Sequence, residues 1–241
     1  MKRLFDIIFS FVLLVCFTPI LLIIGILIFL QDYRSPFYIA KRVGKNSNLF
    51  KMIKFRTMII DAEKSGVYST KYGDTRITFL GKIIRKYKLD ELPQLCNVLI
   101  GHMSFVGPRP NVLVETNLYS KEEQKILNIK PGITDLSSII FSNEGEILEE
   151  FDDPDLAYNQ FIRPWKSRLA LFYLKNNNLF LDIKLILITV ISILNRDKAI
   201  YLITDILKKN KADKLLIEIC SGKTKLKSYP PPGLSKIVDH R

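Results

Sequence analysis

The sequence contains few of the residues that build common metal sites and disulfide scaffolds. Of 241 residues, only two are His and three are Cys. The cysteines (Cys16, Cys96 and Cys220) show neither pairing nor metal-ligand spacing, which favours a reduced, cytosol-facing protein. A Walker-type phosphate loop, a Rossmann glycine pattern and internal repeats are also absent. These absences exclude a histidine-based metal centre, a disulfide-stapled fold, the common nucleotide-binding folds and a solenoid.

Negative charge is also scarce. Lys and Arg number 36 against 24 Asp and Glu, which gives a formal net charge of +12 at pH 7. Such an excess predicts an anionic partner: nucleic acid, anionic lipid or a phosphorylated substrate. Much of the positive charge gathers beside a long apolar run near the N-terminus, which disfavours nucleic acid and favours a membrane surface. The length suits one domain with appendages.

The apolar run covers residues 7–30 and contains no charged side chain. It is long enough to cross a bilayer and too long for the hydrophobic region of a signal peptide. Thr18 and Pro19 lie in its middle, where proline removes a backbone donor and predicts a bend. Lys2 and Arg3 precede the run and a basic segment follows it, which favours two cytoplasmic ends. The residues alone leave two interpretations open: a re-entrant hairpin in one leaflet and a proline-kinked single span.

The stretch richest in chemistry runs from residue 85 to residue 110, RKYKLDELPQLCNVLIGHMSFVGPRP. Asp90, followed by Glu91 and Pro93, predicts a helix start with Asp90 as the N-cap. An apolar face follows, and Gly101 predicts the end of this helix. Two carboxylates would then lie at the positive end of a helix, where a phosphate or a metal-bound phosphate is also held.

The same stretch presents two arginines. Arg85 precedes the carboxylates, and Arg109 lies between Pro108 and Pro110. A Pro-Arg-Pro segment has little conformational freedom, so its guanidinium has little entropy left to lose when it binds an anion. Each feature alone is typical of a capped helix or a proline-rich turn. It is their combination that favours a functional site.

Several segments resemble the motifs of one known family. The run L-D-E-L-P-Q-L-x-N-V-L-x-G-x-M-S-x-V-G-P-R-P is unbroken from Leu89 to Pro110. Shorter matches are Lys54-Phe55-Arg56-Thr57-Met58, Asp74-Thr75-Arg76-Ile77-Thr78 and Lys130-Pro131-Gly132-Ile133-Thr134. Over roughly residues 1–205 the chain resembles the bacterial sugar-phosphate transferases known as monotopic phosphoglycosyl transferases. It departs from the family where Ala40 replaces a usual glutamine, Ser47 a turn glycine and Asp135 a glycine.

The resemblance implies an enzyme that transfers a sugar-1-phosphate from a UDP-sugar to polyprenyl (undecaprenyl) phosphate, as the first membrane step of bacterial glycan assembly. Asp90 would attack the sugar-bearing phosphorus, release UMP and form an aspartyl-phosphosugar. The polyprenyl phosphate would then attack this intermediate and yield polyprenyl-diphosphate-sugar. Glu91, with Asp90 beside it, would hold the cofactor Mg²⁺, since this ion accepts one or two carboxylates plus phosphate oxygens. Arg85 would complete the catalytic set.

The resemblance also implies a substrate-binding set and partners. The expected substrate-binding residues are Lys54, Arg56, Arg76, Gln94, Asn97, Pro108, Arg109 and Pro110. For Gln94 and Asn97, orienting the helix is an equally good interpretation. Expected partners are the UDP-sugar, the polyprenyl phosphate and lipid of the cytoplasmic leaflet, without nucleic acid. Downstream glycosyltransferases and a homodimer are left open, and the identity of the sugar is not predicted.

The expected fold class is α/β but mainly α, in three parts. Residues 1–36 form a membrane helix and junction, which the resemblance makes re-entrant at the cytoplasmic face of the bacterial inner membrane. Residues 37–205 form a small membrane-associated catalytic domain of short helices with a β-hairpin and interfacial helices. Residues 206–241 form a basic, partly disordered tail.

Within the catalytic domain the residue pattern predicts five local structures. They are a hairpin over 37–58, a polar loop over 61–75, a solvated acidic loop over 144–155, a helix over 155–178 bent near Pro164, and a buried or interfacial helix over 179–194.

A second class of function remains open on the residues alone. A non-catalytic adaptor at the membrane surface would also carry a basic, anion-binding face. Such an adaptor needs neither Asp90 and Glu91 at a helix start nor an arginine between two prolines. We therefore expect an enzyme.

Overall fold

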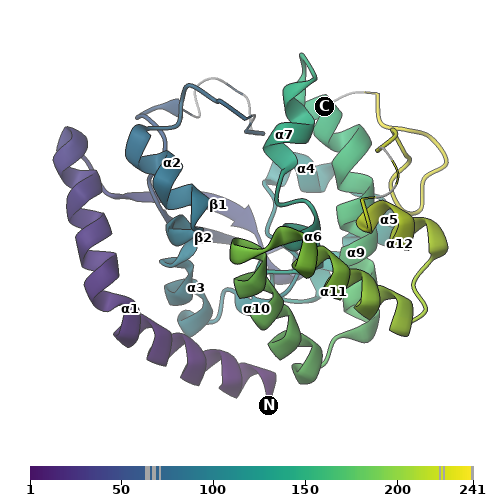
Figure 1. Ribbon diagram of the computed structural model, residues 1–241, viewed down its shortest axis with the longest axis horizontal. Helices are drawn as coiled ribbons and strands as arrows, with labels where there is room; N and C mark the ends of the chain where they lie inside the picture. Colours follow the sequence, from purple (N-terminus) through teal and green to yellow (C-terminus); the bar gives the residue numbers. More distant parts are fainter. Residues whose placement is uncertain (63–65, 67–68, 71, 223, 225, 240–241) are drawn as a thin grey trace.

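A computed structural model describes residues 1–62, 66, 69–70, 72–222, 224 and 226–239. The described part is mainly helical, with a long apolar N-terminal helix and two small sheets of two strands each (Figure 1). The expected mainly α, α/β composition is therefore confirmed. The α-helices are α1 (Lys2–Asp32), α2 (Phe79–Lys86), α3 (Gln94–Ile100), α4 (Leu113–Asn117), α5 (Lys121–Gln124), α6 (Leu136–Ile140), α7 (Glu144–Glu149), α8 (Pro154–Ala157), α9 (Arg163–Asn176), α10 (Leu179–Leu194), α11 (Arg196–Lys209) and α12 (Lys214–Cys220). The strands are β1 (Phe37–Val43), β2 (Leu49–Phe55), β3 (Ser104–Val106) and β4 (Gly132–Thr134).

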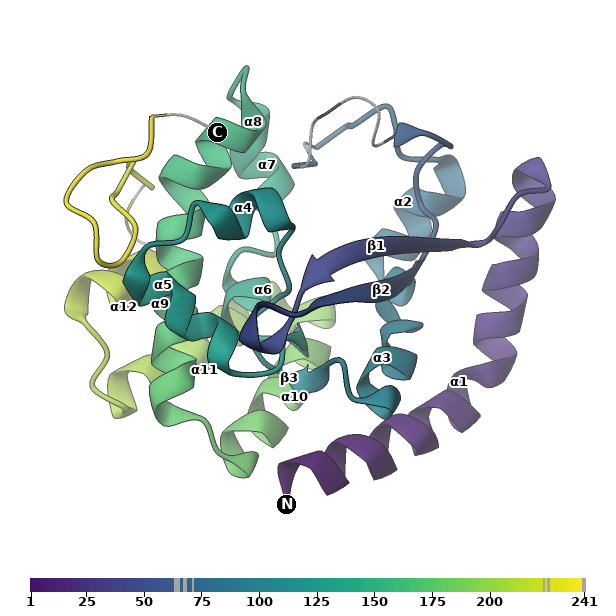
Figure 2. The ribbon, with the colours of Figure 1, turned by 180° about the vertical axis from the view of Figure 1, so that it is seen from behind.

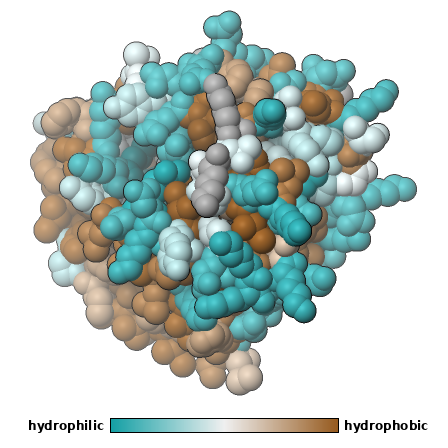
Figure 3. All heavy atoms as spheres, turned by 45° about the vertical axis from the view of Figure 1, so that its right-hand side comes forward, coloured by the Kyte–Doolittle hydropathy of each residue, from teal (hydrophilic) through white to brown (hydrophobic). Residues whose placement is uncertain are grey.

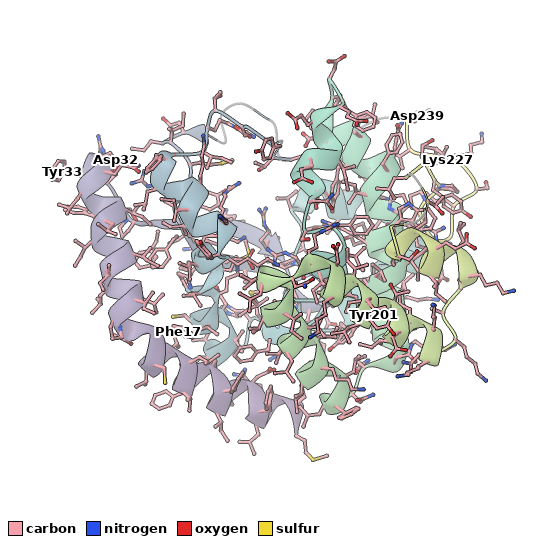
Figure 4. The ribbon with its side chains drawn as sticks, viewed as in Figure 1. Phe17, Asp32, Tyr33, Tyr201, Lys227 and Asp239 are labelled. Atoms are coloured by element: carbon pink, nitrogen blue, oxygen red, sulfur yellow. The ribbon has the colours of Figure 1, made fainter. Side chains whose placement is uncertain are left out.

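Helix α1 is continuous over 31 residues and bends in its middle. Phe17 lies at the corner of the bend (Figure 4), next to Thr18 and Pro19. Pro19 cannot donate to the turn before it, and the Thr18 hydroxyl donates to the Leu14 carbonyl at 2.7 Å. Among the described residues, α1 is the only helix long and apolar enough to cross a membrane, judged by length and composition alone.

Both ends of α1 bind the same folded body (Figures 1 and 2). At the N-terminal end, Lys2 pairs with Asp182 of α10, and Arg3 donates to the last carbonyls of α3 at 2.6 and 2.8 Å. At the far end, Asp32 accepts two hydrogen bonds of 2.6 Å from the guanidinium of Arg56 in the residues after β2. The charged residues that flank the apolar run are therefore anchors to the body.

The hairpin predicted over residues 37–58 is confirmed. Strands β1 and β2 pair antiparallel from Phe37 opposite Phe55 to Val43 opposite Leu49. A 3₁₀ turn connects them, and within it Ser47 has a φ of 62°. Glycine adopts this left-handed conformation without strain, whereas a residue with a side chain adopts it less readily.

Strands β3 and β4 pair parallel and support the Pro-Arg-Pro segment. A Cβ atom on Gly132 would lie 2.1 Å from the backbone nitrogen of Gly107, so the two backbones approach as closely as only glycine permits. The Gly132 amide donates to the Pro108 carbonyl at 3.0 Å. The conformation of residues 108–110 is therefore set by a strand distant in the sequence.

The main core lies between α3, α6, α9, α10 and α11. Its fully buried members include Trp165, Leu169, Leu185 and Ile203. Helix α10 begins and ends at the predicted residues. One of its faces packs on this core, while the large hydrophobic side chains exposed along the helix are Phe180, Ile183, Leu187, Val190, Ile193 and Leu194. In Figure 3 hydrophobic residues gather along the lower and left side of the molecule, whereas hydrophilic and hydrophobic residues are mixed over the rest of that view.

The helical region that was expected to bend near Pro164 contains a π-helical turn, Tyr158–Ile162, between α8 and α9. Pro164 has no amide hydrogen for the carbonyl of Gln160, which lies four residues before it. That carbonyl instead accepts a hydrogen bond of 3.0 Å from the Tyr229 amide.

Two other sequence expectations meet a different arrangement, and a third falls partly outside the described residues. The acidic segment is not a solvated loop: Glu144–Glu149 form α7, because Leu148 is fully buried and Glu144 pairs with Lys166. The domain boundary expected between residues 205 and 206 falls inside α11. Tyr229 of the expected tail packs against Trp165, with ring centres 4.7 Å apart and ring planes tilted by 35°. Of the expected polar loop over 61–75, residues 63–65, 67–68 and 71 lie outside the described residues.

Candidate active site

Nine of the eleven predicted site residues line one open cleft of about 1510 Å³. Its walls come from the β1–β2 hairpin, α2, the turn before α3, the Pro-Arg-Pro segment and helices α4, α6, α9 and α10. The predicted residues in it are Lys54, Arg56, Arg76, Arg85, Asp90, Glu91, Pro108, Arg109 and Pro110. The structure thus brings together residues that are far apart in the sequence: Lys54 and Pro110, the first and last of them, are separated by 56 positions.

Asp90 does not cap a helix as the sequence predicts. Leu89–Glu91 form a separate 3₁₀ turn, and α3 begins only at Gln94, after Pro93. The turn starts at Lys88, whose φ of 55° is in the left-handed region. Such a conformation is unfavourable for a residue with a side chain and is common at functional sites. The end of α3 at Gly101 (φ 94°) is as predicted.

Glu91 is held by two cations. Its two carboxylate oxygens accept hydrogen bonds of 2.5 and 2.9 Å from the guanidinium of Arg109, and Oε1 also accepts one of 3.2 Å from Lys54. Burial alone would raise the pKa of Glu91, but the charges of Arg109 and Lys54 outweigh it and hold this pKa well below its ordinary value. Glu91 is therefore ionised throughout the physiological range.

Asp90 has the opposite environment. Its residue is only 9% exposed, and its carboxylate makes no salt bridge or side-chain hydrogen bond with another described residue. Burial raises its pKa, the neighbouring charge of Glu91 raises it further, and Lys54, Arg85 and Arg109 oppose this from a distance. Two adjacent carboxyl groups whose pKa values are pushed apart are typical of a catalytic pair with divided roles.

Arg85 is positioned by a close helix contact. A Cβ atom on Gly81 of α2 would lie 2.1 Å from the Thr57 carbonyl oxygen, so α2 packs directly on this backbone. One turn later the Arg85 Nε donates to the Thr57 hydroxyl at 2.8 Å. No other side-chain hydrogen bond of Arg85 to a described residue is present, so its two terminal NH₂ groups keep their donors for a ligand.

The other two predicted arginines already have acidic partners. Arg56 binds Asp32 in a bidentate pair and donates to the Ser35 carbonyl at 2.9 Å. Arg76 pairs with Asp74 at 2.7 Å. Both line the cleft, but both also stabilise the segments around it.

Gln94 and Asn97 are fully buried and are not among the residues that line the cleft. Both polar groups of the Asn97 side chain bind strand β2: the oxygen accepts from the Ile53 amide at 2.9 Å, and the nitrogen donates to the Lys51 carbonyl at 2.7 Å. Asn97 therefore orients α3, which was the alternative interpretation. The amide of Gln94 has no hydrogen-bond partner among the described residues.

Among the charged residues that line the cleft, the sequence reasoning gave no role in the site to Arg42, Lys88 and Glu115. Lys88 lies inside the motif stretch but resembles the solvated lysines around it. Arg42 lies on a strand whose excess of lysines and arginines suggested lipid binding. Burial raises the pKa of Glu115 to about 7, opposed by the charges of Lys166 and Arg42. Strand alternation in the hairpin could have separated Arg42 from the exposed Lys41 beside it.

The donor set is compatible with one magnesium ion. Among the described residues no group of three or more His, Cys, Asp or Glu side chains could hold a metal ion by itself. Mg²⁺ requires only one or two carboxylates, however, together with phosphate oxygens and water. Asp90 is free of cations, and Glu91 uses three of about four lone-pair positions for Arg109 and Lys54, which leaves one position on Oε2.

An open cleft with a buried free carboxylate, a cation-bound carboxylate and a surplus of cations, beside a long apolar helix, is the arrangement of a membrane-associated enzyme for phosphorylated substrates. Comparison with known proteins agrees with this class. The family model described as bacterial sugar transferase matches residues 1–196. The chain therefore belongs to the bacterial sugar transferase family, and the prediction of a phosphoglycosyl transferase is confirmed at the level of the family.

Three relatives illustrate the range of the similarity. The chain is 31% identical over 196 residues to a UDP-N-acetylgalactosamine-undecaprenyl-phosphate N-acetylgalactosaminephosphotransferase of Aeromonas hydrophila, covering 80% of this chain and 43% of the relative. It is 33% identical over 193 residues to a UDP-glucose:undecaprenyl-phosphate glucose-1-phosphate transferase of Klebsiella pneumoniae, covering 78% and 39%. It is 36% identical over 207 residues to the exopolysaccharide production protein PSS of Rhizobium leguminosarum bv. phaseoli, covering 82% and 97%. The chain thus spans less than half of the first two relatives and nearly all of the third.

Proposed function

We propose that this protein transfers a sugar-1-phosphate from a UDP-sugar to undecaprenyl phosphate, through a covalent intermediate on Asp90, as an early step of surface-polysaccharide assembly. The names of the Aeromonas and Klebsiella relatives supply the class of donor and acceptor. The observation that carries the mechanism is the contrast between the unpaired carboxylate of Asp90 and the cation-bound carboxylate of Glu91. A nucleophile has to keep its oxygens free, and only Asp90 does.

The reaction has two displacements at one phosphorus. In the first, an Asp90 oxygen forms a bond to the β-phosphorus of the UDP-sugar, and the bond from this phosphorus to the bridging oxygen breaks, which releases UMP. In the second, a phosphate oxygen of undecaprenyl phosphate attacks the same phosphorus and frees the Asp90 carboxylate. Both nucleophiles react as anions, so neither step needs a base. The charges of Lys54, Arg85 and Arg109 favour the ionised form of Asp90 against the effects of burial and of Glu91.

The remaining residues neutralise and orient charge. Arg85 offers the terminal donors of its guanidinium to the phosphates. Arg109 lies between two prolines that restrict its backbone, and its guanidinium holds the carboxylate of Glu91 in place. Glu91, with Asp90, would hold Mg²⁺. When bound, this ion neutralises phosphate oxygens and favours departure of UMP. Lys54 reaches Glu91 at 3.2 Å and adds a second positive charge beside it.

We also propose that α1 is re-entrant at the cytoplasmic face of the bacterial inner membrane. Both ends of α1 bind the same polar body, through Lys2 and Arg3 at one end and Asp32 at the other, and the body itself cannot enter hydrocarbon. A bend at Pro19 brings the chain back to the side from which it came. The cleft is also lined by Leu13 of α1 and Val190 of α10, which provides an apolar approach for the lipid acceptor.

The basic adaptor that the sequence left open is not favoured by any contact in the cleft. An adaptor does not need a buried unpaired carboxylate, which costs folding free energy unless it performs a function.

The decisive experiment for the mechanism is mass spectrometry of the purified protein after incubation with its UDP-sugar and Mg²⁺, without lipid acceptor. We expect an adduct of sugar-phosphate mass on the peptide that contains Asp90, and none in Asp90→Asn. Glu91→Gln should still form the adduct, but slowly and with a higher Mg²⁺ requirement. An adduct on another residue, or UMP release only when both substrates are present, would refute the covalent mechanism on Asp90.

The topology is tested by cysteine labelling in whole cells. In a chain whose native cysteines are replaced by serine, Lys2→Cys and Arg34→Cys should both react only with reagent that reaches the cytoplasm. Pro19→Leu should move part of the population to a full span and make one end accessible from outside. Labelling of Lys2→Cys from outside in the otherwise unchanged chain would establish a single span instead.

A further inference from the structure

The cations that line the cleft differ in their partners. Several have an acidic partner: Lys54 and Arg109 bind Glu91, Arg56 binds Asp32, Arg76 binds Asp74, Arg163 binds Glu123 and Lys166 binds Glu144. Arg85 donates to Thr57, and Arg34 and Lys41 are exposed to water. Two partly buried cations remain. Within the part of the chain that the structure describes, the side chains of Lys88 and Arg42 form neither a salt bridge within 4.0 Å nor a hydrogen bond.

Both unpartnered cations are partly withdrawn from water. Burial lowers the pKa of Lys88, and it lowers the pKa of Arg42 in the same way. Removing a positive charge from water without giving it an anion is unfavourable, because the lost hydration is not replaced. A protein that keeps two such cations in an open cleft gains when an anionic ligand enters. The described residues supply Lys88 and Arg42 with no such anion, so the substrate has to supply it.

The two cations occupy different parts of the cleft. Lys88 begins the turn that carries Asp90, in a left-handed backbone conformation, and the charges of Glu91 and Asp90 act on it directly. Arg42 comes from strand β1, and the acid that acts on it most is Glu115 of α4. Arg109 influences both of them. Lys88 therefore belongs to the turn of the nucleophile, whereas Arg42 belongs to the part of the cleft where β1 meets α4.

We propose that Lys88 and Arg42 hold the two phosphates of the donor separately. Lys88 binds the β-phosphate, which is transferred to Asp90, and Arg42 binds the α-phosphate, which leaves with UMP. This assignment rests on the proposed function and adds to it the orientation of the donor: sugar phosphate at the Asp90 turn, nucleotide toward β1 and α4. As the bond between the β-phosphorus and the bridging oxygen breaks, negative charge moves to the α-phosphate, where Arg42 stabilises it.

The test compares two variants with two matched controls. Lys88→Met and Arg42→Gln remove the two charges. Lys86→Met removes an exposed lysine two residues before Lys88, and Lys51→Gln removes an exposed cation on the strand paired with β1. Neither control residue lines the cleft. Each protein is measured for UMP release, for inhibition by UMP and, by isothermal titration in nanodiscs, for direct binding of UMP and UDP.

The two variants should differ in which phosphate of the ligand they bind less tightly. Arg42→Gln should weaken binding of both UMP and UDP by roughly 10- to 100-fold, the range of a charge-assisted hydrogen bond. Lys88→Met should weaken UDP by a similar factor and leave UMP binding within about twofold of the unchanged protein. It should also slow formation of the adduct on Asp90 by roughly 10²-fold. Lys86→Met and Lys51→Gln should behave as the unchanged protein does.

Two results would overturn the assignment. If Lys88→Met and Arg42→Gln match their controls, neither residue contacts phosphate. If Lys88→Met weakens UMP as much as Arg42→Gln does, the division between the two phosphates is wrong. Lys88→Arg and Arg42→Lys, which keep the charge, should recover part of the binding and so distinguish lost charge from misfolding. If the unchanged protein binds UDP but releases no UMP from any UDP-sugar, the proposed function fails while the binding comparison still tests the two cations.

Discussion

Two arginine–glutamate pairs in this chain have the same chemistry and opposite surroundings. Arg163 and Glu123 lie in the core, with side chains 1% and 0% exposed and contacts of 2.9 and 3.1 Å. Arg109 and Glu91 lie in the cleft, with side chains 28% and 16% exposed and contacts of 2.5 and 2.9 Å. By distance alone the two pairs cannot be told apart.

The difference is in what the carboxylates have left to offer. Glu123 accepts four hydrogen bonds, two from Arg163, one from the Ser167 hydroxyl and one from the Ser120 amide, so its capacity is used up. Glu91 accepts three and is reached by solvent through the cleft. A saturated buried pair stabilises one conformation, whereas an unsaturated pair in a cleft can take part in binding.

The largest expected effect is on the core pair. Arg163→Ala leaves Glu123 ionised in the core without its main partner, and breaking a buried pair in this way costs about 3–5 kcal/mol of unfolding free energy. Denaturant unfolding of the detergent-solubilised protein measures this loss. Lys125→Ala breaks the exposed pair with Glu122 and should cost no more than about 1 kcal/mol. Equal losses in the two variants would contradict the distinction between saturated and exposed pairs.

The cleft pair should show its effect in the rate. Arg109→Ala should slow UMP release by roughly 10²–10³-fold, the effect of removing one donor that stabilises transition-state charge. Arg85→Ala should do the same, and Arg109→Lys should recover only part of the rate because an ammonium cannot bind a carboxylate in bidentate fashion. The unfolding free energy of Arg109→Ala should fall less than that of Arg163→Ala, since water reaches Glu91. Full activity of both alanine variants would show that neither arginine takes part in the reaction.

Glu115, a partly buried carboxyl group that forms no salt bridge with another described residue, extends the comparison. Burial raises the pKa of Glu115 to about 7 from an ordinary value of 4.5. Because the folded-state pKa is raised, the stability contributed by the protonated group is fully present below pH 4.5 and is lost as the pH rises through 7. Relative to Glu115→Gln, the protein should therefore lose about 1–3 kcal/mol between pH 4.5 and 8. A pH-independent difference between the two proteins in denaturant unfolding would contradict the raised pKa.

The smallest effect is expected for a third arginine pair, at the edge of the cleft. Arg56 binds Asp32 in a bidentate contact and anchors the end of α1, with side chains 10% and 30% exposed. Arg56→Gln should change the unfolding free energy by about 1 kcal/mol or less. The rate of UMP release should stay within about threefold, a difference of less than 1 kcal/mol. A loss as large as that of Arg109→Ala would instead place Arg56 on the substrate, as its motif implies.

Several features follow from local sequence and are found in the structure. The apolar run that becomes α1, the hairpin around the turn at Ser47, the end of α3 at Gly101 and the bounds of α10 all depend on residues that are neighbours in the chain. Hydrophobic periodicity, proline and glycine act over a few residues, so their effects can be read without knowing the fold. The candidate site was found for the same reason: most of its predicted residues come from one continuous stretch.

Other features were decided only by contacts between distant segments. The sequence could not show that Glu91 is bound by Arg109 and Lys54 while Asp90 is left free, because the three partners approach only when the hairpin and the strands β3 and β4 have packed. The same is true of Asn97, because both polar groups of its side chain are hydrogen-bonded to the backbone of β2. The role of a charged side chain depends on the opposite charges that lie near it and on its exposure to water. Those quantities depend on the packing of the whole domain and leave no local signature in the sequence.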